Sequence, residues 1–391
     1  MTPESVLESA ATPVELAPGA ALEIPDDIDT PALVVDLVRL RTNLDAMAAH
    51  ARSVGADLYP HVKTHRTLEY AQMQLDSGAK GLTVAKLAEA EVFIDGGFRE
   101  LVMAYPIAGE PKMRHALALT ARAHLRLTVD DLGAAQLLSA VFAAEGRTAE
   151  VMLKIDSGLH RAGVLPERAP ALVRELVGLP GIRFRGILTH EGHVSQMGDR
   201  AQLERAAVGA GDLMAGIAAT LAEQGTPAEI VSVGATSSAL LATRPGVTEV
   251  RPGMYAFNDA SQVNIGTVGI ERCAARVVAT VVSHAAPDRA LIDAGAKSLG
   301  MDRLTAWQEG QAGLYGWIAG RPGWDLFRLS EEHGWLRWIG AGDPTPLTVG
   351  ERVQVLPVHI CAAFHVLGES VAVEQGRVVG RWISVARGSS Q

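Results

Sequence analysis

The sequence has only two cysteines, Cys273 and Cys361, among its 391 residues. Two thiols are too few for a disulfide framework in a chain of this length, which excludes the class of disulfide-stapled secreted domains. The chain also lacks an excess of positive charge, because 35 lysines and arginines oppose 44 aspartates and glutamates, giving a net charge of −9. A general nucleic-acid-binding protein carries a basic surface, so we expect no nucleic-acid partner.

Long apolar runs are missing as well. No stretch of about 18 uncharged apolar residues occurs, so we expect no membrane-spanning segment. The first 25 residues contain no lysine or arginine, whereas a secretory signal begins with basic residues. With 48% apolar and 20% charged residues, the chain can bury a large core, which excludes global disorder. These features predict a soluble, cytoplasmic protein of enzyme size.

Short apolar runs alternate with helical patterns through the first two thirds of the chain. Eight of these runs are typical of strands: Ala32–Val35, Asp57–Val62, Gly81–Val84, Leu101–Ala104, Leu125–Val129, Glu150–Ile155, Arg183–Leu188 and Ile230–Val233. Eight strands separated by helices match a (β/α)8 barrel. The rival architecture is a doubly wound open sheet, which would need a glycine-rich turn after its first strand. This sequence has Asp36-Leu37-Val38 there, so we favour the barrel.

Beyond about Gly269 the pattern changes to β-like runs separated by glycine and proline, with little helical period. We therefore predict an α/β protein in three parts. A loose arm rich in proline covers residues 1–27, a (β/α)8 TIM-type barrel covers residues 28–269, and a mostly β domain covers residues 270–391.

Polar residues follow several predicted strands at their C-terminal ends, where barrel enzymes place their active residues. A lysine at such a site, Lys63, stands between two histidines. A lysine that is removed from water and lies near imidazolium ions loses its proton more readily, and its free amine can form a Schiff base. The run Gly234–Ser238 offers backbone N–H groups and hydroxyls for a phosphate. A reactive lysine together with a phosphate cradle indicates pyridoxal phosphate.

Six segments carry a family pattern: Pro60–His65, Ala104–Pro106, Arg161–Val164, Arg251–Tyr255, Glu332–Gly334 and Pro357–Cys361. Together they resemble the D-serine dehydratase and D-threonine aldolase family, a group of fold-type III pyridoxal phosphate enzymes distantly related to alanine racemase. The resemblance covers the chain from about Thr30 to Gly388. It implies the same barrel and β-domain architecture.

The resemblance also implies roles for single residues. Lys63 would bond to the cofactor, and the residues that would contact the cofactor are His61, Arg161 at its phenolic oxygen, His190 against its ring, and Gly234, Ala235, Thr236, Ser237 and Tyr255 at its phosphate. His359 and Cys361 would ligate a divalent metal. The family is dimeric, with each active site completed by the partner's β domain, so a homodimer is implied in which His333 acts across the interface.

The metal pair can also be considered on physical grounds. His359 and Cys361 are two positions apart, so on a strand both side chains would point to one face. Imidazole and thiolate suit zinc, and two protein ligands leave room for water and substrate. Manganese and magnesium are the alternatives, but both prefer a carboxylate to Cys361. His365 is a weaker third candidate, because the family pattern does not require it.

The resemblance implies a pyridoxal phosphate- and metal-dependent lyase acting on a small D-3-hydroxy amino acid. If Lys63 takes the α-proton and the β-hydroxyl leaves, the products are a 2-oxo acid and ammonia, which is D-serine dehydratase chemistry. If a base such as His65 or His193 deprotonates the hydroxyl instead, the Cα–Cβ bond breaks to give glycine and an aldehyde, which is D-threonine aldolase chemistry.

Different residues favour the two reactions. Cys361 and His190 resemble the dehydratase branch, whereas the segments Ser157–Arg161 and Glu191–His193 look more aldolase-like. We favour the dehydratase. Two further alternatives are an amino-acid racemase, which needs no metal, and a non-catalytic pyridoxal phosphate carrier, which resembles the barrel alone.

Overall fold

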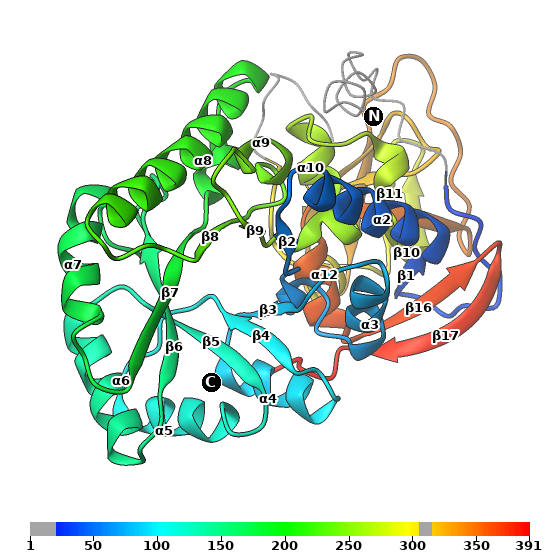
Figure 1. The fold of residues 1–391 in the computed structure, drawn as a ribbon. Helices are drawn as coiled ribbons and strands as arrows, with labels where there is room; N and C mark the ends of the chain where they lie inside the picture. Colours follow the sequence, from blue (N-terminus) through cyan, green and yellow to red (C-terminus); the bar gives the residue numbers. More distant parts are fainter. Residues whose placement is uncertain (1–20, 305–314) are drawn as a thin grey trace. The chain divides into compact units, whose positions relative to one another are not determined.

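The computed structural model describes residues 21–304 and 315–391, which form two compact units (Figure 1). The barrel unit contains residues 45–253 and 386–391, and the sheet unit contains the described residues between 21 and 44 and between 254 and 385. Helix α2 (Leu37–Ser53) begins in the sheet unit and ends in the barrel unit. Most of the predicted N-terminal arm lies outside the described residues.

Eight parallel strands form the barrel unit, in the order β2-β9-β8-β7-β6-β5-β4-β3. Their bounds are β2 Asp57–Leu58, β3 Leu82–Val84, β4 Glu100–Met103, β5 His124–Val129, β6 Ala149–Ile155, β7 Ile182–Thr189, β8 Ile230–Val233 and β9 Glu249–Val250. Beyond β2, His61 and Thr83 form a parallel bridge, and the Thr83 N–H donates to the Pro60 carbonyl at 2.8 Å. This pairing joins the two end strands, which confirms the predicted barrel and excludes the open sheet.

Helices alternate with these strands along the chain (Figure 1). They are α3 Leu68–Asp76, α4 Leu87–Asp95, α5 Glu110–Leu119, α6 Leu132–Ala144, α7 Ala169–Leu176, α8 Arg200–Glu223 and the short α9 Ala239–Ala242. Aspartates cap two of them: Asp131 accepts the Ala134 N–H at the start of α6, and Asp199 accepts the Gln202 N–H at the start of α8.

Helix α8 is the longest helix of the described chain. By length and composition alone, its 24 residues are apolar enough to cross a membrane. Its buried side chains, including Leu203, Ala207, Met214 and Leu221, recur at helical spacing, and the helix contacts β7 and β8. This is the pattern of a helix that covers one side of a barrel.

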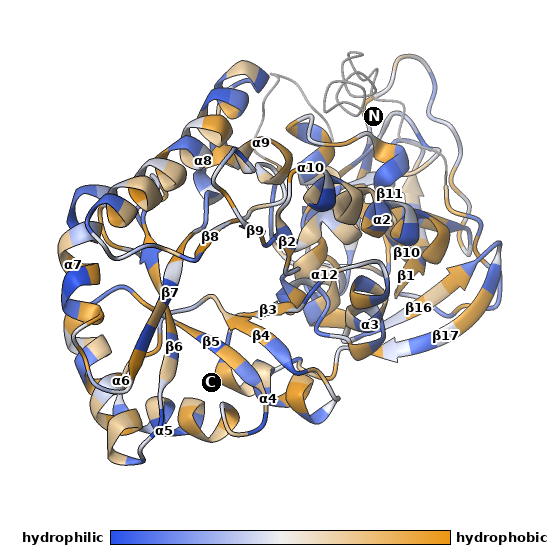
Figure 2. Ribbon diagram, viewed as in Figure 1, coloured by the Kyte–Doolittle hydropathy of each residue, from blue (hydrophilic) through white to orange (hydrophobic). Residues whose placement is uncertain are grey.

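Nine strands form the sheet unit, in the order β11-β14-β13-β12-β15-β10-β1-β16-β17. Their bounds are β1 Ala32–Asp36, β10 Ala275–Ala286, β11 Arg289–Ile292, β12 Gly316–Ile318, β13 Trp324–Leu329, β14 Gly334–Trp338, β15 Arg352–Pro357, β16 Glu369–Glu374 and β17 Arg377–Ile383. Three short helices accompany the sheet: α10 Ala260–Asn264, α11 Ala296–Leu299 and α12 Ile360–Leu367. Strand β16 is mostly hydrophobic in Figure 2, in agreement with the burial of its middle residues. The predicted β-rich second part is therefore present.

The strand assignment needs one correction. Ala32–Val35, the predicted first barrel strand, lies in the sheet unit, where β1 pairs antiparallel with β10 and parallel with β16. The remaining barrel strand is β9, whose two residues are too few to leave a sequence pattern. Residues 28–44 and 254–269 of the predicted barrel segment consequently fall in the sheet unit. The local pattern of β1 could not reveal this, because an apolar run fits either sheet and its partners lie far along the chain.

Candidate active site

Lys63 lies in a 3₁₀ turn, Val62–Thr64, that follows the β2 edge of the barrel. The Arg66 N–H closes this turn on the Val62 carbonyl at 2.8 Å, and the Lys63 N–H points to His61 Nδ1 at 3.4 Å. The residue itself is exposed, which differs from the predicted removal from water. The difference arises because Lys63 lies in a turn beyond the strand rather than within it.

The surroundings of Lys63 are rich in positive charge. Burial lowers the pKa of His61 well below its usual value, and the charges of Lys63 and Arg251 lower it further. Burial likewise lowers the pKa of His190 to about 3, with Lys63, Arg161 and Arg251 acting in the same direction. Both imidazoles are therefore neutral at pH 7.

A second lysine belongs to this cationic group. Lys154 on β6 is 5% exposed and donates from Nζ to the Ala104 carbonyl at 2.9 Å. Burial lowers its pKa to about 7, and Arg251 and Arg161 lower it further. Neighbouring positive charges lower the pKa values of these groups. A bound anion would offset that excess of positive charge. The C-terminal end of the barrel thus fits a phosphorylated cofactor.

The predicted phosphate cradle begins at Gly234, directly after β8. His190 Nδ1 lies 2.9 Å from the Gly234 carbonyl oxygen, and both carboxylate oxygens of the buried Glu191 accept the Gly234 N–H at 3.0 Å. A side chain at position 234 would come within 2.7 Å of the Arg251 backbone nitrogen, so glycine is required there. Because Glu191 accepts the Gly234 N–H, this group is already used within the protein, and the remaining groups of the predicted cradle belong to Ala235–Ser237.

Two further predicted site residues, Arg161 and His193, lie in the loops after β6 and β7. Asp156 accepts the N–H groups of Gly158 and His160 at 2.9 and 3.0 Å, which folds the loop back so that Arg161 follows as an exposed residue. His193, after β7, packs against this loop, because a Cβ on Gly158 would lie 3.2 Å from its Nε2. Its Nδ1 is buried and has no hydrogen-bond partner in the described part of the chain.

The structure does not support His65 as a catalytic base. Its side chain is fully buried, its Nδ1 accepts the Thr67 N–H at 3.0 Å, and its ring packs edge-on against Tyr70 at 5.6 Å. Burial lowers its pKa to about 3 despite a hydrogen bond with Gln74. His65 is a core residue that stabilises the turn after Lys63. Its place in a histidine-lysine-histidine motif made it look functional.

Sequence reasoning missed a buried chain of charged groups inside the barrel. Arg126 on β5 pairs with Glu249 on β9 at 2.5 Å, and Glu249 also accepts a hydrogen bond from Ser232 at 2.6 Å. Arg251 donates to the same Ser232 hydroxyl at 2.6 Å and to the Thr189 carbonyl. These groups could have been recognised in the sequence as charged residues within apolar strands, because such residues are rarely buried unless their charges are paired.

The predicted metal residues lie in the sheet unit. His359 precedes α12 in an extended conformation, and Cys361 lies in the first turn of that helix. The expectation that both lie on a strand is therefore wrong, because the chain turns into a helix at Ile360. The two side chains nevertheless meet: a hydrogen bond with Cys361 raises the pKa of His359 to about 10, against the lowering effect of burial. An imidazole next to a thiol is a donor set that fits zinc.

The sheet unit also contains three other predicted residues. Tyr255 is buried in a 3₁₀ turn, His333 is exposed at the turn between β13 and β14, and His365 is exposed on α12. Within residues 21–304 and 315–391, no group of three or more His, Cys, Asp or Glu side chains has the geometry of a metal site. The buried Cys273, whose pKa burial raises to about 12, is a core residue.

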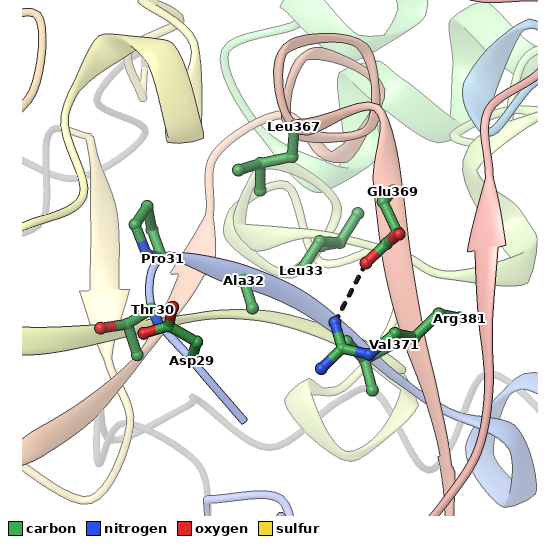
Figure 3. A pocket seen from close by; sticks show the side chains of 9 residues that line it. All are labelled: Asp29, Thr30, Pro31, Ala32, Leu33, Leu367, Glu369, Val371 and Arg381. Carbon is green, nitrogen blue, oxygen red and sulfur yellow. Dashed lines mark hydrogen bonds and ion pairs between the residues drawn. The ribbon is translucent and has the colours of Figure 1, made fainter. Parts of the chain in front are cut away.

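A cavity of about 210 Å³ opens in the sheet unit between the segment around Pro31 and the strands β16 and β17 (Figure 3). Its charged edge is formed by Arg381, which donates to Glu369 at 3.0 Å. None of the predicted site residues lines this cavity. It is therefore distinct from the sites built around Lys63 and His359.

Comparisons with known proteins match both units. The family model described as "Alanine racemase, N-terminal domain" matches residues 35–261, and the model described as "Putative serine dehydratase domain" matches residues 274–373. A D-threo-3-hydroxyaspartate dehydratase of Delftia sp. (strain HT23) is 38% identical, over 86% of this chain and 91% of that protein. A D-threonine aldolase of Arthrobacter sp. is 30% identical, over 99% of this chain and all of that protein.

The structure of the Delftia dehydratase superposes with a TM-score of 0.86 at 35% identity, covering 92% of this chain and 98% of that one. Two variants of that enzyme have also been solved. One replaces a histidine by alanine, and the other replaces a cysteine two positions further along and is described as metal-free. The same spacing of histidine and cysteine occurs here at His359 and Cys361.

Proposed function

The chain belongs to the alanine-racemase-like family of pyridoxal phosphate enzymes, in the branch whose second part is a serine dehydratase domain, and we propose that it is a lyase for D-3-hydroxy amino acids. The favoured reaction is dehydration of the D-serine type, which releases a 2-oxo acid and ammonia. One observation carries the proposal: a single chain combines a lysine in a cation-rich barrel end with an imidazole–thiol pair that suits a metal. A racemase would need only the first of these.

Pyridoxal phosphate, when bound, supplies an aldehyde for amine exchange and a ring that accepts electrons from Cα. Lys63 Nζ is the amine that would hold it, and after exchange with a substrate the same nitrogen would accept the α-proton. Neutral His190, fixed through Nδ1 to Gly234, would lie against the ring. The hydroxyls of Thr236 and Ser237, each 8% exposed, and the backbone of Ala235–Ser237 would bind the phosphate.

His359 and Cys361 would hold a divalent cation, and such an ion supplies Lewis acidity toward the β-hydroxyl of a substrate. We favour zinc over manganese and magnesium, because the thiolate of Cys361 is a soft ligand. The histidine and cysteine variants of the Delftia enzyme, with the same spacing, support this assignment. We also infer a homodimer, in which the exposed His333 would complete the partner's site. Two unbridged cysteines are compatible with a reducing cytoplasm.

The alternative function is an aldolase of the D-threonine type, which forms glycine and an aldehyde. Its supporting observation is His193, whose buried Nδ1 has no partner in the described chain and whose ring lies at the β6 and β7 loops. A base at this position could remove the β-hydroxyl proton. The 30% identity to an aldolase over the whole chain supports the same reading.

A product assay separates these functions. Purified enzyme with pyridoxal phosphate and Zn²⁺ is given D-serine, D-threonine and D-threo-3-hydroxyaspartate, with and without EDTA, and 2-oxo acid, ammonia, glycine and aldehyde are measured. If the enzyme is a dehydratase, it should release 2-oxo acid and ammonia in equal amounts and should lose turnover with EDTA. Glycine with aldehyde would favour the aldolase. Metal-independent epimerisation without either set of products would overturn both.

A further inference from the structure

Asp259 is a fully buried carboxylate whose two oxygens serve two different helices of the sheet unit. One oxygen, Oδ1, accepts the Gln262 N–H at 3.1 Å and the Ser261 hydroxyl at 2.6 Å, and so caps the start of α10. The other oxygen, Oδ2, accepts the Ile360 N–H at 3.0 Å. Ile360 is also fully buried and stands between His359 and Cys361. Asp259 therefore anchors the backbone between the two predicted metal ligands.

This anchor decides where α12 begins. His359 is extended, with φ −134° and ψ 101°, whereas the chain is helical from Ile360 onward. The change between the two conformations sets the direction of the Cα–Cβ bonds of His359 and Cys361 and so lets the two side chains meet. A second backbone link, from the Ser261 N–H to the Val358 carbonyl at 3.3 Å, holds the residue before His359. The segment is therefore fixed on both sides of His359.

A second carboxylate touches the imidazole itself. Asp302 Oδ2 lies 3.1 Å from His359 Nδ1. When a metal displaces the Nε2 proton, a histidine that donates Nδ1–H to a carboxylate presents the lone pair of Nε2, which is the usual arrangement of a metal-binding histidine. The carboxylate also makes the imidazole a stronger ligand and adds negative charge near the cation.

We propose that Asp259 and Asp302 are positioning residues that hold His359 and Cys361 in the geometry of a divalent metal site. This inference rests on the metal site of the proposed function. Asp259 acts on the backbone between the ligands, and Asp302 acts on the ring of one ligand. Neither needs to touch the metal.

The test measures metal binding rather than turnover. Holoenzyme with pyridoxal phosphate is stripped of metal by a chelator and titrated with Zn²⁺ and Co²⁺ against a chromophoric competitor. Asp259→Asn and Asp302→Asn are each expected to weaken binding about 10- to 100-fold. In Asp259→Asn, the amide has one acceptor oxygen for donors on two sides, so it cannot cap α10 and anchor Ile360 at the same time. The cobalt complex should also show a shifted thiolate-to-cobalt absorption band, which reports the geometry at Cys361.

Two control variants match the changes in burial and charge. Asp325→Asn removes a buried carboxylate of the same unit that pairs with Arg337 at 2.9 Å, and Asp288→Asn removes an exposed one. Both are expected to bind metal as the wild type does. His359→Ala tests the site itself: if it binds metal as tightly as the wild type, the metal site of the proposed function fails.

Other results would contradict the positioning role of Asp259 and Asp302. This role fails if His359→Ala loses the metal while both aspartate variants keep wild-type affinity and an unchanged cobalt band. It also fails if Asp325→Asn weakens metal binding as much as Asp259→Asn does, because the effect would then reflect general destabilisation. An increase in cobalt d–d band intensity in Asp302→Asn, which signals a lost ligand, would make Asp302 a direct ligand and overturn its positioning role.

Discussion

His190 Nδ1 lies 2.9 Å from the carbonyl oxygen of Gly234, and this contact joins the ends of β7 and β8. Because the pKa of His190 is lowered to about 3, the ring is neutral and its one N–H is committed to Gly234. The histidine thus has two functions. It presents a flat neutral ring to the barrel end, and it fixes the turn that we assign to the cofactor phosphate.

Replacing His190 by Phe separates these functions, since the ring remains and the hydrogen bond is lost. The Gly234 carbonyl then lacks its donor, at a cost of about 1–3 kcal/mol. We expect pyridoxal phosphate to bind about ten-fold more weakly to His190→Phe, as measured by equilibrium titration of the apoenzyme. His193→Phe is the matched control, because His193 has no hydrogen bond to the 234 turn in the described part of the chain. Unchanged affinity in His190→Phe would show that the turn is held without this bond.

Lys63 is expected to carry the cofactor, although a second lysine lies in the same barrel. Lys154 has the lowered pKa of about 7 that a reactive amine needs, but its Nζ is buried and bonded to the Ala104 carbonyl. Borohydride reduction followed by peptide mass spectrometry should place the adduct on Lys63. Lys63→Ala should lose both the adduct and turnover, whereas Lys154→Met should keep the adduct. A reduced adduct on Lys154 would contradict the site assignment.

His65 should make the protein less stable in mild acid. Its pKa is about 3 in the folded state against 6.5 in the unfolded chain, so the unfolded chain takes up a proton first as the pH falls. Stability is therefore retained above pH 6.5 and lost below it. Between pH 7 and pH 5, this one group contributes a loss of about 2 kcal/mol.

The variant His65→Asn keeps an acceptor for the Thr67 N–H but does not titrate. Its unfolding free energy, measured by urea denaturation at pH 7 and pH 5, should fall by about 2 kcal/mol less than that of the wild type. The comparison is made within each protein, so a general loss of stability in the variant does not matter. An equal fall in both proteins would mean that His65 is not responsible.

Local patterns allowed much of the molecule to be predicted from the sequence. The alternation of strands and helices gave the barrel, because each parallel strand is an apolar run that ends in polar residues. Polar residues were expected after the predicted strands Asp57–Val62 and Arg183–Leu188, and the structure places Lys63 beyond β2 and His190 directly after β7. The side chains of Lys63 and His190 therefore come to the same end of the barrel, as expected.

Features that depend on distant partners could not be predicted in this way. The run Ala32–Val35 is equally apolar in either sheet, and only its pairing with β10 and β16 decides its place. The helical start at Ile360 depends on Asp259, about a hundred residues earlier in the chain. His65 has the same sequence context as a catalytic residue, and only its packing against Tyr70 reveals a core side chain.

The buried pair Arg126–Glu249 also lies beyond local prediction, and it leads to a test of barrel stability. Both side chains are almost completely buried, and the Arg126 guanidinium also stacks on the Tyr59 ring at 4.5 Å. Removing one partner leaves a buried charge without its counterion, which costs about 3–5 kcal/mol. Glu249→Leu and Arg126→Met should each destabilise the protein by about this amount in urea unfolding. The double variant should lose clearly less than the sum of the two.

An exposed pair gives the matched comparison. Arg114 and Glu110 on α5 lie 2.7 Å apart with more than half of each side chain exposed, so breaking this pair should cost less than about 1 kcal/mol. Strictly additive losses at Arg126 and Glu249 would contradict the prediction, because additivity would mean that the two charges do not interact. A large coupling free energy at the buried pair and none at the exposed pair would support the prediction. The paired charges would then explain how Ser232 and Arg251, which are hydrogen-bonded to each other beside Glu249, can lie inside the barrel.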